Sequence, residues 1–201
     1  MGGLAVLFLL GLYILLTVVT IIKVKPVWAK GLVLLAALLI PTADAVYGRY
    51  KLKQMCAAEA GLKVYRVAEH VDGFMRDSAD EYWIKKYGYQ FTEGKNSPNY
   101  YRFSKQNGQI IREDNVTPKS KYRLRRSYDD SSIYRRSQYL IEDITTGEIL
   151  STDTMLTFEG GWAERFLAQF SDSGGGNVAW CTDNPDILIV IDRIITSTLK
   201  H

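Results

Sequence analysis

The N-terminal stretch constrains the fold of this chain most, because no side chain from Gly2 to Ile22 carries a charge. About 20 consecutive apolar residues are enough for a helix to cross a lipid bilayer. A helix buried in a soluble protein would show a polar face, which this stretch lacks. The pattern therefore predicts a transmembrane helix over about residues 3–22.

A second apolar segment runs from Gly31 to Gly48, after a short turn that contains Pro26. It is less apolar than the first, and packing against the first helix would support its insertion. We predict a second transmembrane helix over about 31–47. The two helices together predict a transmembrane hairpin over residues 1–48.

Asp44 is the one acidic residue of the second segment, and it has three interpretations. An ionisable residue inside a membrane is a candidate functional site. A hydrogen-bonded or hydrated position at the membrane interface is the simpler explanation, because Asp44 lies near the end of the segment. A third interpretation makes residues 30–45 a signal sequence with the cleavage pattern Ala43-Asp44-Ala45.

The remainder of the chain is nearly neutral. It holds 22 basic and 21 acidic residues from Arg49 onward, once the four charged residues before it are removed from the totals of 25 and 22. Long-range attraction to a polyanion is therefore not its defining feature, and nucleic acid is not an expected partner. The stretch is long enough to bury a core, which predicts one soluble domain over 49–201.

Basic residues lie on both sides of the second segment, so the positive-inside rule alone leaves its orientation nearly tied. They are Lys23, Lys25 and Lys30 before the segment and Arg49, Lys51 and Lys53 after it. The uncharged start and the two cysteines, which are compatible with one disulfide, favour both termini outside. We expect a bacterial inner-membrane protein with two spans and a periplasmic C-terminal domain, and the opposite orientation stays open.

The two cysteines, Cys56 and Cys181, are 125 residues apart. This spacing matches no zinc pattern, since zinc sites usually contain close pairs, and no metal site is predicted. In an oxidising compartment the two residues can form a disulfide between the membrane-proximal helix and the C-terminal region. Two separate buried thiols explain the sequence equally well.

Residues 49–201 combine helix and strand patterns. The turn sequences Asn107-Gly108 and Thr145-Thr146-Gly147 each lie between runs of strand-forming residues, as in β-hairpins. Gly88 can end a short helix that starts at a capping-box pattern, and Ile187–Leu199 predicts a terminal helix or a buried strand. The fold class expected is α+β, with a mostly antiparallel sheet of five to six strands and a few short helices.

No known catalytic motif occurs in the sequence, so we predict no catalytic residue, no cofactor and no enzymatic activity. His70 lies close to Glu69 and Asp72, and a carboxylate-paired general base is conceivable there. A solvated loop histidine is the simpler explanation. A membrane-tethered hydrolase that relies on His70 is accordingly only the third functional hypothesis.

The stretch 119–136 is rich in both basic residues and tyrosine. Aromatic side chains interleaved with cations can stack bases and hold phosphates. A half-buried strand produces the same alternation, with tyrosine inward and arginine outward. Candidate ligand or partner contacts are Arg123, Arg125 and Arg135 here, and Tyr82-Trp83 in the short helix.

Four short segments are distinctive: Ile40–Tyr50, Cys56–Tyr65, Thr146–Leu150 and Gly160–Trp162. They resemble segments of uncharacterised bacterial membrane proteins with two N-terminal spans and a small C-terminal domain. The resemblance implies this architecture, and no activity or residue role comes with it. The architecture alone is similar to that of cyclic-nucleotide-sensing antiphage effectors, which is a likeness of fold only.

Together these features predict a membrane-anchored, non-enzymatic interaction protein with a periplasmic domain. Immunity against a toxin, exclusion, or a place in an envelope complex would fit. Expected partners are the lipid bilayer and either another protein or a second copy of this chain. The alternative hypothesis is a cytoplasmic ligand or nucleotide sensor that binds a phosphate with Arg123, Arg125 and Arg135, and whose hairpin oligomerises and disrupts the membrane.

Overall fold

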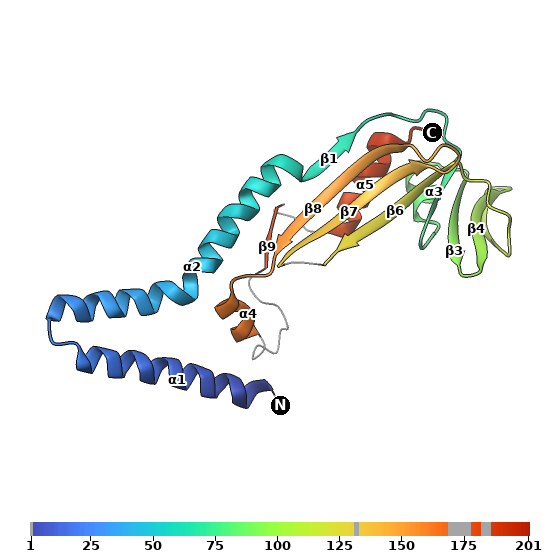
Figure 1. Ribbon diagram of the computed structural model, residues 1–201. Helices are drawn as coiled ribbons and strands as arrows, with labels where there is room; N and C mark the ends of the chain where they lie inside the picture. Colours follow the sequence, from blue (N-terminus) through green and yellow to red (C-terminus); the bar gives the residue numbers. More distant parts are fainter. Residues whose placement is uncertain (1, 131–132, 169–177, 182–185) are drawn as a thin grey trace. The chain divides into compact units, whose positions relative to one another are not determined.

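The computed structural model describes the whole chain except residues 1, 131–132, 169–177 and 182–185 (Figure 1). The described residues form five helices and nine strands. The helices are α1 (Gly2–Lys23), α2 (Val27–Glu59), α3 (Tyr82–Tyr87), α4 (Trp162–Ala168) and α5 (Ile187–Thr198). The strands are β1 (Gly61–Val64), β2 (Gly73–Arg76), β3 (Phe91–Asn96), β4 (Asn99–Gln106), β5 (Gln109–Asp114), β6 (Tyr122–Asp129), β7 (Tyr134–Asp143), β8 (Ile149–Phe158) and β9 (Ala179–Trp180).

The strands belong to one mixed sheet with the order β1-β8-β7-β6-β2-β3-β4-β5, and β9 pairs with β8. Strand β2 runs parallel to both of its neighbours, β3 and β6. Parallel neighbours need a crossover connection, and the connection from β2 to β3 contains α3. The pairs β1–β8, β3–β4, β4–β5, β6–β7 and β8–β9 are antiparallel.

Two compact units make up the molecule, each assembled from three separate segments. The first unit comprises Met1–Ala58, Asp130–Arg135 and Leu156–Cys181, and the second comprises Glu59–Asp129, Arg136–Met155 and Thr182–His201. The units therefore alternate along the chain, whereas the domains expected from the sequence, 1–48 and 49–201, follow one another.

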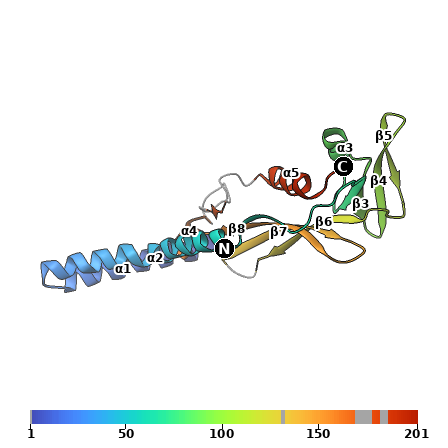
Figure 2. The same ribbon diagram turned by 90° about the horizontal axis from the view of Figure 1, so that it is seen from above.

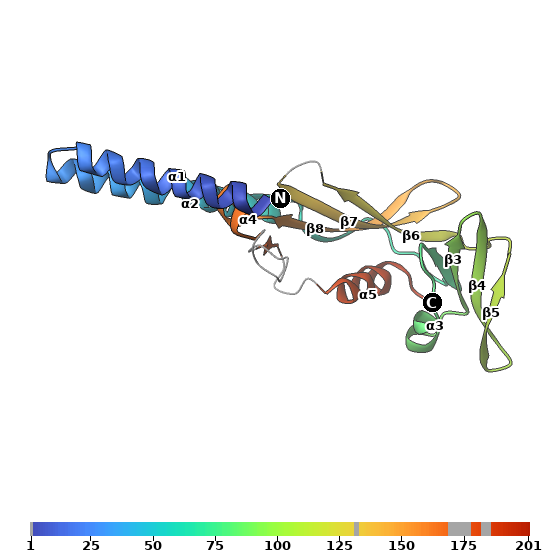
Figure 3. The ribbon, with the colours of Figure 1, turned by 90° about the horizontal axis from the view of Figure 1, so that it is seen from below.

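The second unit buries its core between the sheet and α5. The buried apolar side chains of α5 share one helix face, and they are Val190, Ile191, Ile194 and Ile195. Sheet residues from several strands join the same apolar cluster, among them Phe74, Leu124, Ile141 and Leu150. Figures 2 and 3 show α3 and α5 on the same side of the sheet. This arrangement explains why the apolar C-terminal segment forms an amphipathic helix and not a strand.

In the first unit, the second half of α2 packs against the end of β8. Gly48 and Leu52 are buried on one side of the helix. Glycine is needed at position 48, because a Cβ atom there would come within 2.2 Å of the Phe158 ring. The packing therefore depends on a close approach of the helix backbone to an aromatic side chain.

The predicted transmembrane hairpin is wrong as part of the fold. No single helix in the described chain is both long enough and apolar enough to cross a bilayer. Only the bent pair Val27–Ile40 and Thr42–Glu59 satisfies the two criteria, on length and composition alone. The second helix does not end near residue 47, because α2 continues to Glu59. It bends by 47° between Ile40 and Thr42, where Pro41 removes an N–H donor that a helix interior needs.

The predicted sheet is also wrong, because nine strands in a mixed sheet replace five to six in a mostly antiparallel one. Strands β2 and β9 are short, with four and two residues, so they give little pattern to recognise. Strand β2 also lacks alternation, since Gly73, Phe74 and Met75 are all buried. Such continuous burial is typical of a strand covered on both faces.

The turn predictions are confirmed. Strands β4 and β5 pair Gln106 with Gln109, and the two residues between them, Asn107 and Gly108, have φ angles of 50° and 80°, as a two-residue hairpin turn requires. Gly147, with a φ of 72°, lies between β7 and β8, which are neighbours in the sheet. Gly88 ends α3 in the left-handed conformation, as predicted.

Candidate functional site

Exposed apolar side chains cover α1 and the first half of α2, and we call them the apolar helical surface. Their exposed fractions lie between 38 and 83%. In the described part of α1 they are Phe8, Leu12, Ile14, Leu15, Leu16, Val18, Val19 and Ile22, and in α2 they are Val27, Trp28, Leu32, Leu34, Leu35, Leu38, Leu39 and Ile40. Soluble monomers rarely expose so large an apolar surface, so this surface is the main candidate for function.

Polar groups within the two helices are satisfied locally. Thr17 and Thr20 donate hydrogen bonds to the carbonyl oxygens of Tyr13 and Leu16, one turn earlier, at 2.9 and 2.7 Å. The Tyr13 hydroxyl donates to the Ala37 carbonyl of α2 at 2.5 Å. Hydroxyl groups bonded in this way need no water, which suits an apolar environment.

The basic residues of the N-terminal region gather at the turn between α1 and α2. Lys23, Lys25 and Lys30 lie at or near this turn, and the first acidic residue of the chain is Asp44. Trp28 lies among the lysines and is 72% exposed. Tryptophan and lysine are both common where a protein meets lipid headgroups.

Asp44 joins α2 to the start of α4 within the first unit. Its Oδ2 accepts a hydrogen bond from the Trp162 backbone N–H at 2.6 Å. Its Oδ1 is buried without a hydrogen-bond partner in the described chain, and a Cβ atom at Gly161 would come within 2.6 Å of it. Beside it, Arg49 forms an ion pair with Glu164 of α4. The structure thus gives Asp44 a capping role inside the folded unit.

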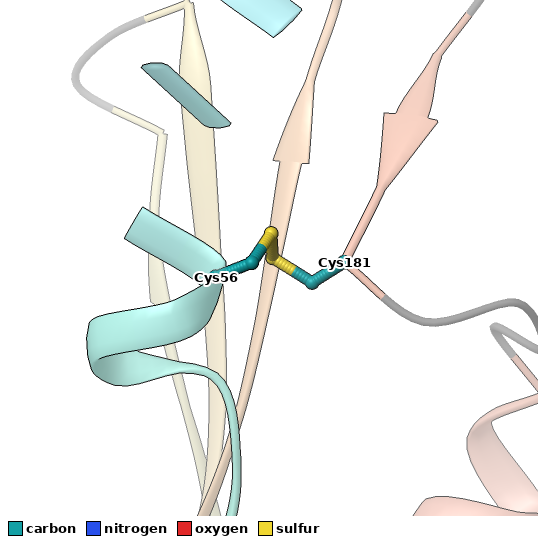
Figure 4. The surroundings of a disulfide bond; sticks show 2 residues. All are labelled: Cys56 and Cys181. Carbon is teal, nitrogen blue, oxygen red and sulfur yellow. A yellow bond between two sulfur atoms is a disulfide. The ribbon is translucent and has the colours of Figure 1, made fainter. Parts of the chain in front are cut away.

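Cys56 and Cys181 form a disulfide, as one of the two interpretations of the sequence predicted (Figure 4). Their Cα atoms are 5.4 Å apart. Cys56 lies in the last turns of α2, and the Cys181 N–H donates a hydrogen bond to the Leu156 carbonyl at 3.1 Å. The bond therefore ties the end of α2 to the segment that follows β9.

The predicted basic contact residues are paired with acids. The Arg123 Nε donates to Glu142 on the neighbouring strand at 2.7 Å, and Arg125 lies 3.9 Å from the same carboxylate. Arg135 belongs to the first unit, where it pairs with Asp130 and Glu159. The structure brings Arg123 and Arg125 together on Glu142, and it gives Arg135 different partners.

The two aromatic contact candidates have different environments. Tyr82 is partly exposed and donates a hydrogen bond to Asp192 at 3.2 Å. Trp83 is fully buried, its ring stacks on Tyr87, and its Nε1 has no hydrogen-bond partner among the described residues. Hydrogen bonds to Asp192 and Tyr82 raise the pKa of Lys86, which keeps its charge beside them. Of the predicted pair, only Tyr82 is exposed to solvent.

His70 lines a pocket of about 590 Å³ in the second unit. Glu69, Asp72, Lys119 and Lys121 also line this pocket. No hydrogen bond or ion pair of His70 occurs with any residue that the structure describes, and no group of three metal ligands is found in that part of the chain. The mixed charges of this pocket select no ligand chemistry.

Sequence reasoning missed Arg126, which lies on the core-facing side of β6. Strand alternation puts it on the face of Tyr122 and Leu124, and it pairs in register with the buried Tyr139. Its guanidinium lies 5.4 Å from the Tyr139 ring centroid. The signal was present in the sequence, because residues 122, 124 and 126 share one face of a strand.

Comparisons with protein-family models, with curated proteins and with solved structures found no match for this chain. The resemblance to uncharacterised bacterial membrane proteins therefore stays a prediction. Function has to be argued from the geometry and chemistry of the described residues.

Proposed function

We propose that this chain is a non-enzymatic interaction protein that its apolar helices hold at a lipid membrane, with the disulfide-bonded part in an oxidising compartment such as the bacterial periplasm. The apolar helical surface is the observation that carries the proposal. Water contact with so many apolar side chains is unfavourable by about 25 cal/mol per Å². Lipid acyl chains relieve this cost without any protein partner.

The disulfide supports the compartment. Disulfide bonds persist in the periplasm and outside the cell, and they are rare in a reducing cytosol. Cys56 lies close in sequence to the apolar part of α2, so the oxidising side begins just beyond the lipid-contacting residues. The lysine-bearing turn at the other end of these helices suits contact with lipid headgroups.

Membrane flotation tests the role of the apolar surface. Leu15→Arg combined with Leu35→Arg places two charges on it, and a matched control, Ile144→Arg, changes an exposed apolar residue of the second unit. We expect the native chain and the control to float with lipid vesicles and the double variant to stay at the bottom of the gradient. Flotation of all three proteins would contradict the proposal.

Reporter fusions test the compartment separately. Alkaline phosphatase is active only after export, whereas a conventional fluorescent protein fluoresces only in the cytoplasm. We expect a C-terminal fusion to show phosphatase activity without fluorescence. The reverse result would move the folded part to the cytoplasm and favour the sensor hypothesis.

A further inference from the structure

Three neighbouring strands of the second unit place two arginines and a tyrosine on the same face of the sheet. Arg76 of β2 is in register with Leu124 of β6, and Arg126 of β6 is in register with Tyr139 of β7. Register partners point to the same face, and so do residues two apart in one strand. Arg76, Arg126 and Tyr139 therefore converge on rigid elements.

These residues line a pocket of about 220 Å³, which we call the arginine pocket. Its apolar wall is formed by Leu124 and by Ile187 and Ile191, which lie one turn apart on α5. Ser78 adds a hydroxyl group. Figure 3 shows α5 on one side of β6 and β7. The pocket thus has a cationic side on the sheet and an aliphatic side on the helix.

The cations of the pocket are only partly neutralised. Arg126 donates from Nε to the Ser137 hydroxyl at 2.9 Å, and no carboxylate in the described chain forms an ion pair with it. Arg76 is largely buried, and its one ion pair there, to Asp80, is long at 3.4 Å. Asp77 is the only acidic residue among the described residues that line the pocket.

Tyr139 offers a further polar group. Its side chain is buried and its hydroxyl makes no hydrogen bond within the described residues. Burial raises the pKa of Tyr139, and the positive charges of Arg126 and Arg76 both act in the opposite direction. All three side chains line the same pocket, so the two guanidinium groups and the phenol are placed to act on one ligand.

We propose that the arginine pocket binds a small carboxylate that carries a short aliphatic group. The planar fork of a guanidinium matches the two oxygens of a carboxylate, and the Tyr139 hydroxyl donates a third hydrogen bond. The aliphatic group then contacts Leu124, Ile187 and Ile191. A volume of 220 Å³ equals that of about seven water molecules in the liquid, so the ligand has a similar number of non-hydrogen atoms.

A ligand with a carboxylate and a short aliphatic group has two sources. One is a free short-chain carboxylic acid, and the other is the C-terminal residue of a peptide with an aliphatic side chain. Both present one carboxylate next to a branched apolar group. Two comparisons distinguish them: a free carboxylate with its amide, and a peptide with a simple acid.

Calorimetric titration of the full chain in a nonionic detergent, with 4-methylpentanoate as the probe, tests the proposal. We expect saturable binding with one site per chain, after subtraction of a micelle blank. The uncharged analogue 4-methyl-1-pentanol lacks the carboxylate, and inorganic phosphate lacks the aliphatic group. Each should bind at least tenfold more weakly than 4-methylpentanoate. Absence of saturable binding, or equal binding of phosphate, overturns the proposal.

Variants locate the site. Arg126→Gln should weaken binding of 4-methylpentanoate about tenfold or more, since it removes a charge-assisted hydrogen bond, and Tyr139→Phe should weaken it several-fold while keeping the ring. The matched control is Arg125→Gln, one residue away on the opposite face of β6, which should bind normally. An equal loss in Arg125→Gln, or none in Arg126→Gln, overturns the assignment.

The tripeptide Gly-Gly-Leu and its C-terminal amide identify the source. Tighter binding of the tripeptide than of 4-methylpentanoate, with no binding of the amide, supports a peptide C-terminus as the ligand. Binding of 4-methylpentanoate alone supports a free acid. Binding of the amide as tight as that of the free tripeptide shows that the carboxylate is not recognised and overturns the proposal.

Discussion

Two helices of this chain are built from the same kinds of residue and have opposite environments. α5 buries Val190, Ile191, Ile194 and Ile195 against the sheet. α1 exposes most of its leucine, isoleucine and valine side chains over the part that the structure describes. The difference lies in the sequence pattern, because α5 has an apolar face and a polar face whereas α1 is apolar all around.

The comparison separates two ways of stabilising an apolar helix. α5 is held by side-chain packing inside the second unit, so its apolar residues contribute directly to the free energy of folding. The apolar residues of α1 contact few protein atoms, so they contribute little to that free energy. They determine instead whether the helix is stable in contact with water or with an apolar environment. Substitutions in the two regions should therefore change different measurements.

The largest effect is expected in the first unit, from loss of the disulfide. The double variant Cys56→Ser, Cys181→Ser opens a covalent loop between residues 125 apart. Loop-closure entropy predicts a loss of about 4 to 5 kcal/mol in the free energy of unfolding. Urea denaturation in nonionic detergent measures it, with reduced native protein as the control. Equal stability of the oxidised and reduced protein would show that the disulfide contributes little to the free energy of unfolding.

The core of the second unit should respond almost as strongly. Ile194→Ala leaves a cavity at a fully buried position and should cost about 3 to 4 kcal/mol. Leu15→Ala, at a position that is 58% exposed, should change the same free energy by less than about 0.5 kcal/mol. Urea denaturation of both variants compares them directly. Equal losses of unfolding free energy in the two variants would mean that α1 is packed as a core helix, as α5 is.

Glu93 offers a third test because it is a fully buried carboxylate in the second unit. It accepts hydrogen bonds from Arg102 Nε at 2.8 Å, from the Lys119 N–H at 3.1 Å, and from the Ser120 N–H at 2.9 Å. Burial alone would raise the pKa of Glu93, but the hydrogen bonds from Ser120, Arg102 and Lys119 together lower it below 4.5. The ionised carboxylate therefore stabilises the fold.

The sign of the pH dependence follows. A carboxylate with a lowered pKa in the folded state stabilises above its unfolded pKa, and this contribution is lost as the pH falls through the folded pKa. Glu93→Gln should cost about 3 kcal/mol at neutral pH, and its Tm should fall less than that of the native protein below pH 4.5. Thermal unfolding from pH 7 to 3 checks this, and parallel curves would contradict it.

The smallest effect is expected at the surface of the same sheet. Arg123→Gln removes one partner of Glu142, which keeps Arg125 at 3.9 Å. Because the Arg123 side chain is 39% exposed, water and salt screen the pair, and the loss should be about 0.5 kcal/mol. Urea denaturation at low and high salt measures it. A loss as large as that of Ile194→Ala would show that this ion pair is part of the core.

Local signals in the sequence were enough to find the turns, but they left the C-terminal segment open between a helix and a buried strand. Asn107-Gly108 and Gly88 were predicted correctly because positive φ angles favour these residue types. Strand β2 was missed because it has only four residues and three consecutive ones are buried, so no alternation is visible. The hairpin failed as a fold prediction because composition does not reveal that α2 bends at Pro41 and continues to Glu59.

The candidate residues show the same limit. Two cysteines allow only one pairing, but the sequence did not decide between a disulfide and two separate thiols. Whether an arginine is paired depends on strands that are distant in sequence, so Glu142 beside Arg123 could not be foreseen. Trp83 was expected at the surface, and the crossover between β2 and β3 that buries it is a property of the sheet topology.

The covalent link between Cys56 and Cys181 also decides how mechanical force would pass through the molecule. A pull between the N-terminal helices and the C-terminus travels along the chain to Cys56, across the two sulfur atoms, and on from Cys181. Unfolding of the backbone between the two cysteines cannot lengthen an oxidised molecule, because the disulfide bypasses it, and α5 is the next described element after Cys181. An oxidised molecule stretched from its ends would peel off α5 and keep its β-strands, whereas a reduced one would unravel throughout.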